Sequence, residues 1–298
     1  MSELVAEKER ETASGAPDPF AMDLSPEEFA RFAQLITQRL GIRMPEAKLT
    51  MLQGRLARRI RQLQLGSFAE YWQYLFRSPD AEREYVHFVD AITTNKTEFF
   101  RESQQLDYLV ARALPALDPD TRFHRPWRAA VWCAGCSSGE EAWTLAMMLS
   151  EYQAGRPGFD FSILATDIST RVLSQAREAT YPRELVEPVP PALRNCYLLS
   201  SRDPSRKVVR IVPSLRAKVD FQRLNFMDRT YALKAMSDVI FFRNVMIYFD
   251  KPTQETVVNK LCRNLQPGGY LFVGRSESLM GLSVPLRQEG LSIYRKLH

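Results

Sequence analysis

A turn of small residues followed by two adjacent carboxylates is the segment of this sequence best suited to hold a small ligand. The apolar run 129–133 leads into Gly135, and Gly139 stands directly before Glu140 and Glu141. Glycine lets the backbone turn sharply and approach a ligand closely, and open α/β sheets bind ligands at the carboxyl ends of their strands. The turn has neither Gly-x-Gly-x-x-Gly nor Gly-Lys-Ser/Thr, and paired glutamates would repel a pyrophosphate. These features favour a zwitterionic or cationic ligand over a dinucleotide, although many such turns are only structural.

Asp167 is a second candidate for ligand binding, because it closely follows another apolar run, residues 159–165. An acid at the end of the second strand of such a sheet can accept hydrogen bonds from both ribose hydroxyls of a nucleoside. It could equally cap the next helix, a role that Ser169 could also fill. Asp167 alone does not decide between the two.

The cysteines and histidines do not predict a metal site. Cys133 and Cys136 form a lone Cys-x-x-Cys pair, and a redox or zinc role is conceivable for it. Zinc normally needs a second pair of ligands, and the histidines are scattered at positions 87, 124 and 298. We interpret the two thiols as small packed side chains and expect no metal. The total of four cysteines is too small for a secreted disulfide framework.

The composition is that of a globular chain with a basic excess. Hydrophobic residues make up 45% of the 298 residues, which suffices for a sizeable core, and the formal net charge is +5. The charge suits nucleic acid, an anionic membrane or an acidic protein, and it does not choose among them. No apolar run approaches the roughly 20 residues of a membrane helix, and the charged N-terminus lacks the apolar core of a signal peptide. We therefore expect a cytoplasmic protein that does not insert into a membrane.

The first hundred residues are predicted to form a small helical bundle behind a disordered tail. Residues 1–21 are polar, small and proline-containing, which is typical of disorder. Ser25 and Ser67 each stand three residues before a glutamate, so each predicts a helix that begins with a capping box. Apolar residues at helical spacing predict further helices over residues 46–65 and 80–92. We place the helical domain at residues 22–100.

The rest of the chain, residues 101–298, is predicted to be an α/β domain. Apolar runs at 129–133, 159–165, 217–221, 237–242 and 270–274 alternate with helix-forming segments. This alternation indicates a parallel sheet covered on both faces, and residues 291–296 are expected to add an antiparallel closing strand. The proline-rich stretch 181–216 interrupts the alternation and is predicted to be a small inserted antiparallel β-subdomain.

Longer motifs make the interpretation specific. The segments 93–101 (TTNKTEFFR), 242–250 (FRNVMIYFD) and 266–278 (QPGGYLFVGRSES), together with the turn 135–141, closely resemble the chemoreceptor glutamate methyltransferases of the CheR type. The resemblance runs in order from about residue 25 to 296. It implies a helical N-terminal domain, a Rossmann-like class I methyltransferase domain, and transfer of a methyl group from S-adenosylmethionine to glutamate carboxylates of bacterial chemoreceptors. Cys133 and Cys136 fall in a stretch that varies among relatives.

The resemblance also implies site residues. Those that would contact S-adenosylmethionine or its product, S-adenosylhomocysteine, are Asn95, Thr97, Arg101, Glu141, Asp167, Asn225, Phe226, Arg243 and Asn244. Arg101 and Tyr248 would lie near the transferred methyl group and are the candidate catalytic residues. Apart from the resemblance, Arg243 could merely pair with a carboxylate and Tyr248 could be an ordinary half-buried tyrosine. Asn95 and Thr97 could simply form turns.

The predicted partner is the glutamate-rich, helical cytoplasmic region of a chemoreceptor. The helix over residues 46–65 carries a basic face that the resemblance implies for docking, made of Lys48, Arg55 and Arg59. A solvated helix face is the alternative, since charge runs are usually that. The stretch 199–207 lacks the glycines associated with members that bind a receptor C-terminal pentapeptide, so we expect no dependence on that peptide.

Two other functions remain to be weighed. A nucleic-acid methyltransferase would suit the basic charge, but it would usually carry Asn/Asp-Pro-Pro-Tyr/Phe or a Pro-Cys nucleophile where this chain has residues 243–246 (RNVM). We therefore expect no nucleic-acid substrate. A signalling module that binds the cofactor or receptor without turnover would leave the same fold. Such decay is disfavoured by the presence of Arg101, Asp167, Asn244 and Tyr248.

Overall fold

The computed structural model describes residues 22–118, 126–203 and 205–297. They form two compact units: a helical unit, made of the chain up to Phe32 with Pro45–Ile92, and an α/β unit, made of Ala33–Met44 with the chain from Thr93 onward. The tail predicted to be disordered, residues 1–21, lies outside the described residues. Within those described ranges, no helix is long and apolar enough to cross a membrane.

The helical unit confirms the predicted N-terminal bundle. Its helices are α1 (Pro26–Leu40, as far as Phe32), α2 (Leu49–Gln62), α3 (Phe68–Arg77) and α4 (Ala81–Ile92), with a 3-10 turn η1 (Glu46–Lys48) before α2. Phe32 packs edge-on against Trp72, with ring centroids 5.1 Å apart, and stacks on Phe88. Because all three aromatic side chains come from different helices, they join the bundle across its core.

The helix starts follow from capping. Ser25 Oγ accepts a hydrogen bond from Glu28 N at 3.2 Å, and Glu28 Oε2 accepts one from Ser25 N at 3.0 Å, so both bonds of the predicted capping box are present. Ser67 Oγ likewise accepts from Glu70 N at 3.1 Å. The Glu70 carboxylate accepts instead from Gly66 N, at 2.7 Å, so the second box is only half formed.

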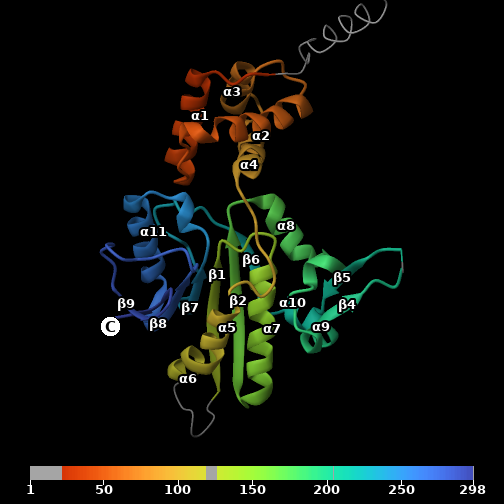
Figure 1. Ribbon diagram of the computed structural model, residues 1–298, viewed down its shortest axis with the longest axis vertical. Helices are drawn as coiled ribbons and strands as arrows, with labels where there is room; N and C mark the ends of the chain where they lie inside the picture. Colours follow the sequence, from red (N-terminus) through yellow and green to blue (C-terminus); the bar gives the residue numbers. More distant parts are fainter. Residues whose placement is uncertain (1–21, 119–125, 204, 298) are drawn as a thin grey trace, which may run out of the picture. The chain divides into compact units, whose positions relative to one another are not determined.

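Seven strands of the described chain form the main sheet of the α/β unit (Figure 1). They are β1 (Trp127–Ala134), β2 (Phe159–Asp167), β6 (Val219–Arg223), β7 (Ser237–Phe242), β8 (Leu265–Val273), β9 (Leu286–Gly290) and β10 (Ile293–Lys296). Their order is β6-β2-β1-β7-β8-β10-β9. The pairings from β6 to β8 are parallel, and β10 is antiparallel to both β8 and β9. This is the predicted Rossmann-like sheet with an antiparallel strand.

One strand of this sheet was not predicted. The antiparallel strand near the C-terminus is present as β10, but it does not close the sheet, because β9 lies outside it. Residues Arg287, Gln288 and Glu289 of β9 are polar and exposed. An edge strand of this kind lacks the buried alternation by which a strand is recognised in sequence.

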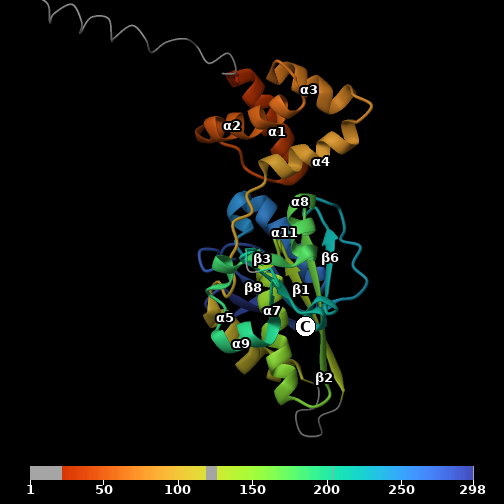
Figure 2. The same cartoon turned by 90° about the vertical axis from the view of Figure 1, so that its right-hand side faces the viewer.

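Helices cover both faces of the sheet, so that the strands lie between two apolar cores. Val131 and Phe241 face one core, whereas their neighbours Trp132 and Ile240 face the other, as the two-residue period of a strand requires. The first core is covered by α5 (Ser103–Tyr108), η2 (Leu109–Ala113), α6 (Leu114–Leu117), α7 (Glu140–Gly155) and α8 (Thr170–Glu178); α11 (Lys251–Arg263) covers the second. Both views show α7 running alongside β1 and β2 (Figures 1 and 2).

The proline-rich interruption is a small antiparallel β-subdomain, as predicted. It contains β3 (Thr180–Pro182), β4 (Leu198–Ser200) and β5 (Val208–Ile211) in the order β3-β5-β4, with helices α9 (Pro191–Tyr197) and α10 (Pro213–Arg216) and a 3-10 turn η3 (Arg183–Val186). In Figure 1 it projects to the right of α7, away from β7 and β8.

Gly139 is a position where only glycine fits. Its φ is +99°, and a Cβ built on it would lie 2.9 Å from both Ala176 Cβ and Tyr181 Oη. We expect Gly139→Ala to destabilise the α/β unit by about 1–3 kcal/mol, because alanine meets both backbone strain and a steric clash. Thermal unfolding followed by circular dichroism measures the loss.

Gly155, at the other end of the same helix α7, is the matched control, because a Cβ there meets nothing within 4 Å. Gly155→Ala should leave the unfolding midpoint unchanged or slightly higher. Equal losses in the two variants would contradict the assignment.

Candidate active site

The carboxyl ends of neighbouring strands gather the candidate residues at one edge of the main sheet. In the parallel register Cys133 of β1 pairs with Ala165 of β2 and Phe241 of β7, and Phe242 pairs with Val273 of β8. The segments that follow these strands therefore emerge side by side. They are the glycine turn 135–139, Asp167, the segment 243–248 and the segment 274–278. This edge is where parallel α/β sheets bind ligands.

Asp167 joins the ends of β1 and β2. Its Oδ2 accepts a hydrogen bond from Ser137 N and its Oδ1 accepts one from Ser169 N, both at 2.9 Å. The cap of α8 is provided by Ser169, whose Oγ accepts from Val172 N at 3.4 Å. Asp167 is 8% exposed, so its carboxylate lies at this edge of the sheet almost shielded from solvent. The sequence left open whether Asp167 or Ser169 caps the helix, and Ser169 does.

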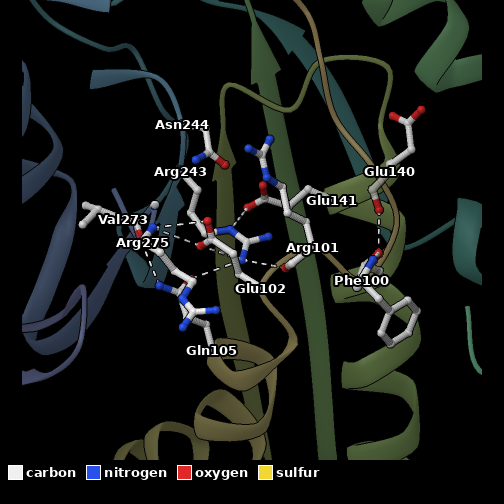
Figure 3. Close-up of polar contacts among 12 residues, drawn as sticks. Phe100, Arg101, Glu102, Gln105, Glu140, Glu141, Arg243, Asn244, Val273 and Arg275 are labelled. Atoms are coloured by element: carbon white, nitrogen blue, oxygen red, sulfur yellow. Dashed lines mark hydrogen bonds and ion pairs between the residues drawn. The ribbon is translucent and has the colours of Figure 1, made fainter. Parts of the chain in front are cut away.

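A buried arginine connects β7 to the segment that precedes α5 (Figure 3). Arg243 directly follows β7, and only 1% of its side chain is exposed. Its Nε donates to Glu141 Oε1 at 3.2 Å, and its Nη1 donates to Arg101 O at 2.9 Å and to Gln105 Oε1 at 3.2 Å. Glu102 Oε2 lies 3.7 Å from Nη1. Arg243 therefore binds carboxylates, as its alternative interpretation allowed, and it does so among the candidate residues.

The partners of Arg243 are themselves anchored. Gln105 Nε2 donates to Val273 O, the last residue of β8, at 2.8 Å. The Glu102 carboxylate accepts from Arg275 N at 3.2 Å. Burial lowers the pKa of Arg243, but the charges of Glu141 and Glu102 raise it, and the net shift is upward. The guanidinium thus stays charged, as a buried cation with paired carboxylates should. Nothing in the sequence motifs marked Glu102 or Gln105.

Left-handed backbone is concentrated around this edge. Phe100, Glu102, Ser137 and Asn244 have φ values of +55°, +54°, +49° and +60°, although none is glycine. Such residues cost about 1–3 kcal/mol each and are retained where the surrounding structure holds them, often at functional sites. Phe100 N, for example, donates to Thr144 Oγ1 on α7 at 3.1 Å.

The structure connects most of the implied cofactor residues. Ser137 Oγ donates to Asn95 O at 2.9 Å, which brings Asn95 beside the turn that Asp167 holds. Leu224 N donates to Asp167 O at 3.0 Å. This bond holds the chain that leads into Asn225 and Phe226 beside the end of β2.

The other implied residues differ in their surroundings. Asn225 Nδ2 donates to Arg39 O at 2.8 Å, and the Phe226 ring packs edge-on against Phe242 at 5.0 Å. Arg101 is half-buried, and its Nη1 donates weakly to Lys96 O at 3.4 Å. Thr97 and Tyr248 are also half-buried, and Tyr248 O accepts from Arg43 N at 2.8 Å.

The implied docking residues lie in the helical unit, where two of them are held by other residues. Arg59 makes a two-pronged ion pair with Glu84 on α4, with distances of 2.9 Å from Nε to Oε1 and 2.6 Å from Nη2 to Oε2. Glu84 is buried and also accepts from the hydroxyl of Tyr71 at 2.8 Å. The hydrogen bond to Glu84 raises the pKa of Arg59, which opposes the effect of burial. Arg55 Nη1 donates to Ile92 O at the end of α4. Sequence spacing placed these cations on one helix face but could not reveal their partners.

Cys133 and Cys136 are both buried in the core on the α7 side of the sheet. Burial raises the pKa of each thiol well above its ordinary value, so the reactive thiolate form is disfavoured. Among the residues that the structure describes, no three His, Cys, Asp or Glu side chains come together as a metal site.

Comparison with known proteins covers nearly the whole described chain. A family model described as "CheR methyltransferase, all-alpha domain" matches residues 27–93, and one described as "CheR methyltransferase, SAM binding domain" matches residues 95–294. Chemotaxis protein methyltransferase 2 of Pseudomonas aeruginosa is 37% identical over 270 residues, which are 90% of this chain and 92% of that protein.

Two further relatives agree in extent. A chemotaxis protein methyltransferase of Borreliella burgdorferi is 36% identical over 87% of this chain and 91% of its own length. Another, from Klebsiella aerogenes, is 37% identical over 92% of this chain and 90% of its own length. The similarity thus spans both the helical unit and the α/β unit.

If Asp167 binds a ribose, Asp167→Asn should weaken the binding of S-adenosylhomocysteine at least about ten-fold. The amide would place an N–H₂ group against one of the two backbone N–H donors and would offer the ligand fewer acceptors. Isothermal titration calorimetry measures the dissociation constant.

Asp160 provides the control on the same strand. It lies at the opposite end of β2, where it forms an ion pair with Lys218, so Asp160→Asn should leave the dissociation constant within about two-fold, as surface changes usually do. Equal affinities in wild type and Asp167→Asn would refute the ribose assignment.

Proposed function

Because this chain belongs to the CheR methyltransferase family, we infer that it is an S-adenosylmethionine-dependent protein-glutamate O-methyltransferase that esterifies chemoreceptor glutamates in bacterial chemotaxis. The inference rests on two observations that agree: the family models match residues 27–93 and 95–294, and the candidate site residues lie together within the matched region. The SAM-binding model covers residues 95–294, and within them Asp167, the glycine turn and Asn244 follow adjacent strands at one edge of the sheet.

The residues at this edge suit a nucleoside that carries a sulfonium. Asp167 is a suitable acceptor for the ribose hydroxyls, because its carboxylate is nearly buried at the end of β2, where an acid of such a sheet accepts hydrogen bonds from a ribose. Glu141 supplies a negative charge near the glycine turn, and 11% of its side chain is exposed. We propose that these acids, with Asn95, Thr97, Arg101, Asn225, Phe226, Arg243 and Asn244, bind S-adenosylmethionine and S-adenosylhomocysteine. The methyl donor supplies an activated methyl group on a positively charged sulfur.

Transfer of a methyl group to a carboxylate does not require the protein to move a proton. An exposed glutamate side chain has a pKa of about 4.3 and is already ionised near neutral pH, so no general base is needed. The absence of histidine from the matched motifs agrees with this. An anion and a cation react to give neutral products, so a site with little water favours the reaction. The protein must chiefly align oxygen, methyl carbon and sulfur in a line.

Arg101 and Tyr248 are the candidates for this alignment. Arg101 lies between strained Phe100 and Glu102, and its carbonyl oxygen is held by Arg243. A strong direct pair between Arg101 and the substrate carboxylate would reduce the nucleophilicity of that carboxylate, so we propose an indirect orienting role for Arg101. The hydroxyl of Tyr248 is proposed to orient the substrate carboxylate or the sulfonium end of the donor.

One assay tests the function against its rivals. The protein is incubated with methyl-labelled S-adenosylmethionine and cytoplasmic fragments of chemoreceptors, and alkali-labile methanol is collected from the protein fraction. Glutamate methyl esters release methanol in base, whereas methylated nucleic-acid bases do not. Label that enters added RNA or DNA instead would favour a nucleic-acid methyltransferase. Cofactor binding without any label transfer would favour a non-catalytic module.

We expect Tyr248→Phe and Arg101→Ala each to lower the turnover number at least about ten-fold in this assay, because each removes a group that aligns the reactants. Circular dichroism and S-adenosylhomocysteine titration serve as controls for folding and for cofactor binding. Unchanged turnover in both variants would remove these residues from the mechanism.

We propose that the partner is the helical cytoplasmic region of chemoreceptors and that the protein acts in the cytoplasm. We propose that a basic face formed by Lys48, at the end of η1, with Arg55 and Arg59 of α2 attracts the glutamate-rich receptor helix. Arg59 is already paired with buried Glu84, so its charge is partly neutralised inside the helical unit. The loop between β4 and β5 contains no glycine, and we propose that a receptor C-terminal pentapeptide is not required.

Charge reversal tests docking without disturbing the Arg59–Glu84 pair. The double variant Lys48→Glu, Arg55→Glu should raise the KM for receptor fragments at least about three-fold, and the effect should shrink at high salt. The control is Arg77→Glu, Arg83→Glu, which changes the net charge equally at exposed positions of α3 and α4. The dissociation constant for S-adenosylhomocysteine should stay constant in both. A KM that rises equally in the two double variants would contradict docking through α2.

A further inference from the structure

Glu277 is a buried carboxylate outside the proposed cofactor and catalytic residues, and it contacts the loop that carries Tyr248. Glu277 follows β8 within the segment 274–278, next to the loop 244–248 that follows β7. Glu277 is 6% exposed. The resemblance drew attention to the motif around it but assigned no function to the carboxylate.

The Glu277 carboxylate binds main-chain N–H groups of both loops. Its Oε2 accepts from Asn244 N at 2.8 Å and from Gly274 N at 2.6 Å, and its Oε1 accepts from Ile247 N at 3.3 Å. One side chain thus holds the loop 244–248 at its first residue and again next to Tyr248. Hydrogen bonds from N–H groups to a carboxylate are roughly twice as strong as neutral ones.

Glycine at position 274 makes room for this arrangement. A Cβ on Gly274 would lie 2.8 Å from Glu277 Oε2 and 2.5 Å from Asn244 Nδ2. Any larger residue would therefore displace the carboxylate or the asparagine. The close approach of the two loops depends on this glycine, because a residue without a Cβ lets other atoms come close to the backbone.

The loop gains from such an anchor because its own backbone hydrogen bonds, from Tyr248 N to Val245 O and from Phe249 N to Met246 O, do not include the N–H groups at its start. Asn244 has a left-handed φ of +60°, a conformation that costs free energy unless neighbours hold it. The 3-10 turn η4 (Met246–Tyr248) receives no side-chain hydrogen bond from its N-cap residue, Val245. The N–H groups at the start of a helical turn lack partners within the turn, and Glu277 accepts from that of Ile247.

The pKa of Glu277 reflects both the cost of burying its carboxylate and the hydrogen bonds that offset this cost. Burial raises the pKa of Glu277 above that of an exposed glutamate, and the backbone N–H groups that face it oppose the rise. A buried carboxylate is tolerated when hydrogen bonds compensate for lost hydration. Here the compensation comes from main-chain groups of the two loops, so the carboxylate and the loop geometry depend on each other.

We propose that Glu277 is a positioning residue for methyl transfer, which fixes the backbone of the loop 244–248 and thereby the place of the Tyr248 side chain. The proposal rests on the proposed function, in which Asn244 and Tyr248 belong to the site. It deepens that function by adding a residue that acts through the main chain rather than on the reactants.

The first test needs no catalysis. Glu277→Gln keeps the size of the side chain but replaces one acceptor oxygen by an N–H₂ donor, which faces N–H groups. Amide hydrogen exchange followed by mass spectrometry should show faster exchange in peptides that cover residues 243–249, at least about ten-fold, with the rest of the sheet unchanged. Unaltered exchange there would overturn the proposal.

The second test uses turnover at saturating methyl donor. Glu277→Gln should lower kcat at least about ten-fold while the KM for receptor fragments stays within about two-fold, because misplacement of an aligning group affects the reacting geometry first. The matched control is Glu255→Gln on α11, where the carboxylate accepts from Ser283 N at 2.8 Å, in a loop without candidate site residues. Its kcat should stay within about two-fold of wild type.

A double variant separates positioning from general loss of stability. In the Tyr248→Phe background, Glu277→Gln should reduce kcat by less than about three-fold, because the hydroxyl that Glu277 places is already gone. Equal reductions in both backgrounds would contradict the proposal. If Glu277→Gln does not fold, Glu277→Asp replaces it, with the same order of effects expected because the shorter side chain cannot reach both loops. Absence of ester formation by the wild type would contradict the proposed function alone, since the exchange measurement is independent of turnover.

Discussion

A buried positive charge must be matched by negative charge and by hydrogen bonds, and this requirement at Arg243 organises the edge of the sheet. The Arg243 side chain is 1% exposed, and a cation so placed is tolerated only with paired acceptors. Those acceptors come from α7 (Glu141), from the segment before α5 (the carbonyl of Arg101, with Glu102 nearby) and from α5 itself (Gln105). Segments far apart in the chain are thereby brought to the end of β7, where the candidate residues lie.

At the same edge of the sheet, carboxylates act as clamps, meaning that each accepts hydrogen bonds from main-chain N–H groups and so holds a loop in place. Asp167 holds the turn after β1 through Ser137 N and the start of α8 through Ser169 N. Glu277 holds the loop after β7, and Glu102 holds the segment after β8 at Arg275 N. Each clamp stands beside non-glycine residues with left-handed backbone, so the hydrogen bonds to charged acceptors offset local strain. A reaction that depends on alignment rather than on proton transfer benefits from such stiffness, because small displacements of the aligning groups reduce the rate.

Most of the fold could be predicted from the periodicity of apolar residues and from the residues that begin, end or interrupt helices and strands. The parallel strands, the helical bundle and the small inserted sheet carry strong local signals, such as buried apolar runs, capping boxes and clustered prolines. The edge strand β9 carries none, because its residues Arg287, Gln288 and Glu289 face solvent. It pairs with β10 through its backbone, and only Leu286 at its start packs against an apolar core. For the same reason β10 was expected at the edge but lies between β8 and β9. Backbone pairing at a polar edge leaves little trace in residue types.

The site divides in a similar way. Gly135, Gly139 and Asp167 could be proposed from their places after apolar runs, because the turn and the strand end are local features. The partners of these residues could not, since contact is set by folding: Gln105 and Arg243 are 138 positions apart, and Glu277 and Asn244 are 33 apart. Lys48, Arg55 and Arg59 illustrate the same limit, because helical spacing predicts a shared face but not the carboxylate of Glu84 that meets Arg59. A side chain that binds backbone N–H groups is the hardest to foresee, because every residue except proline offers the same donor. The position of such an acid in space, rather than its neighbours in sequence, decides which loop it holds.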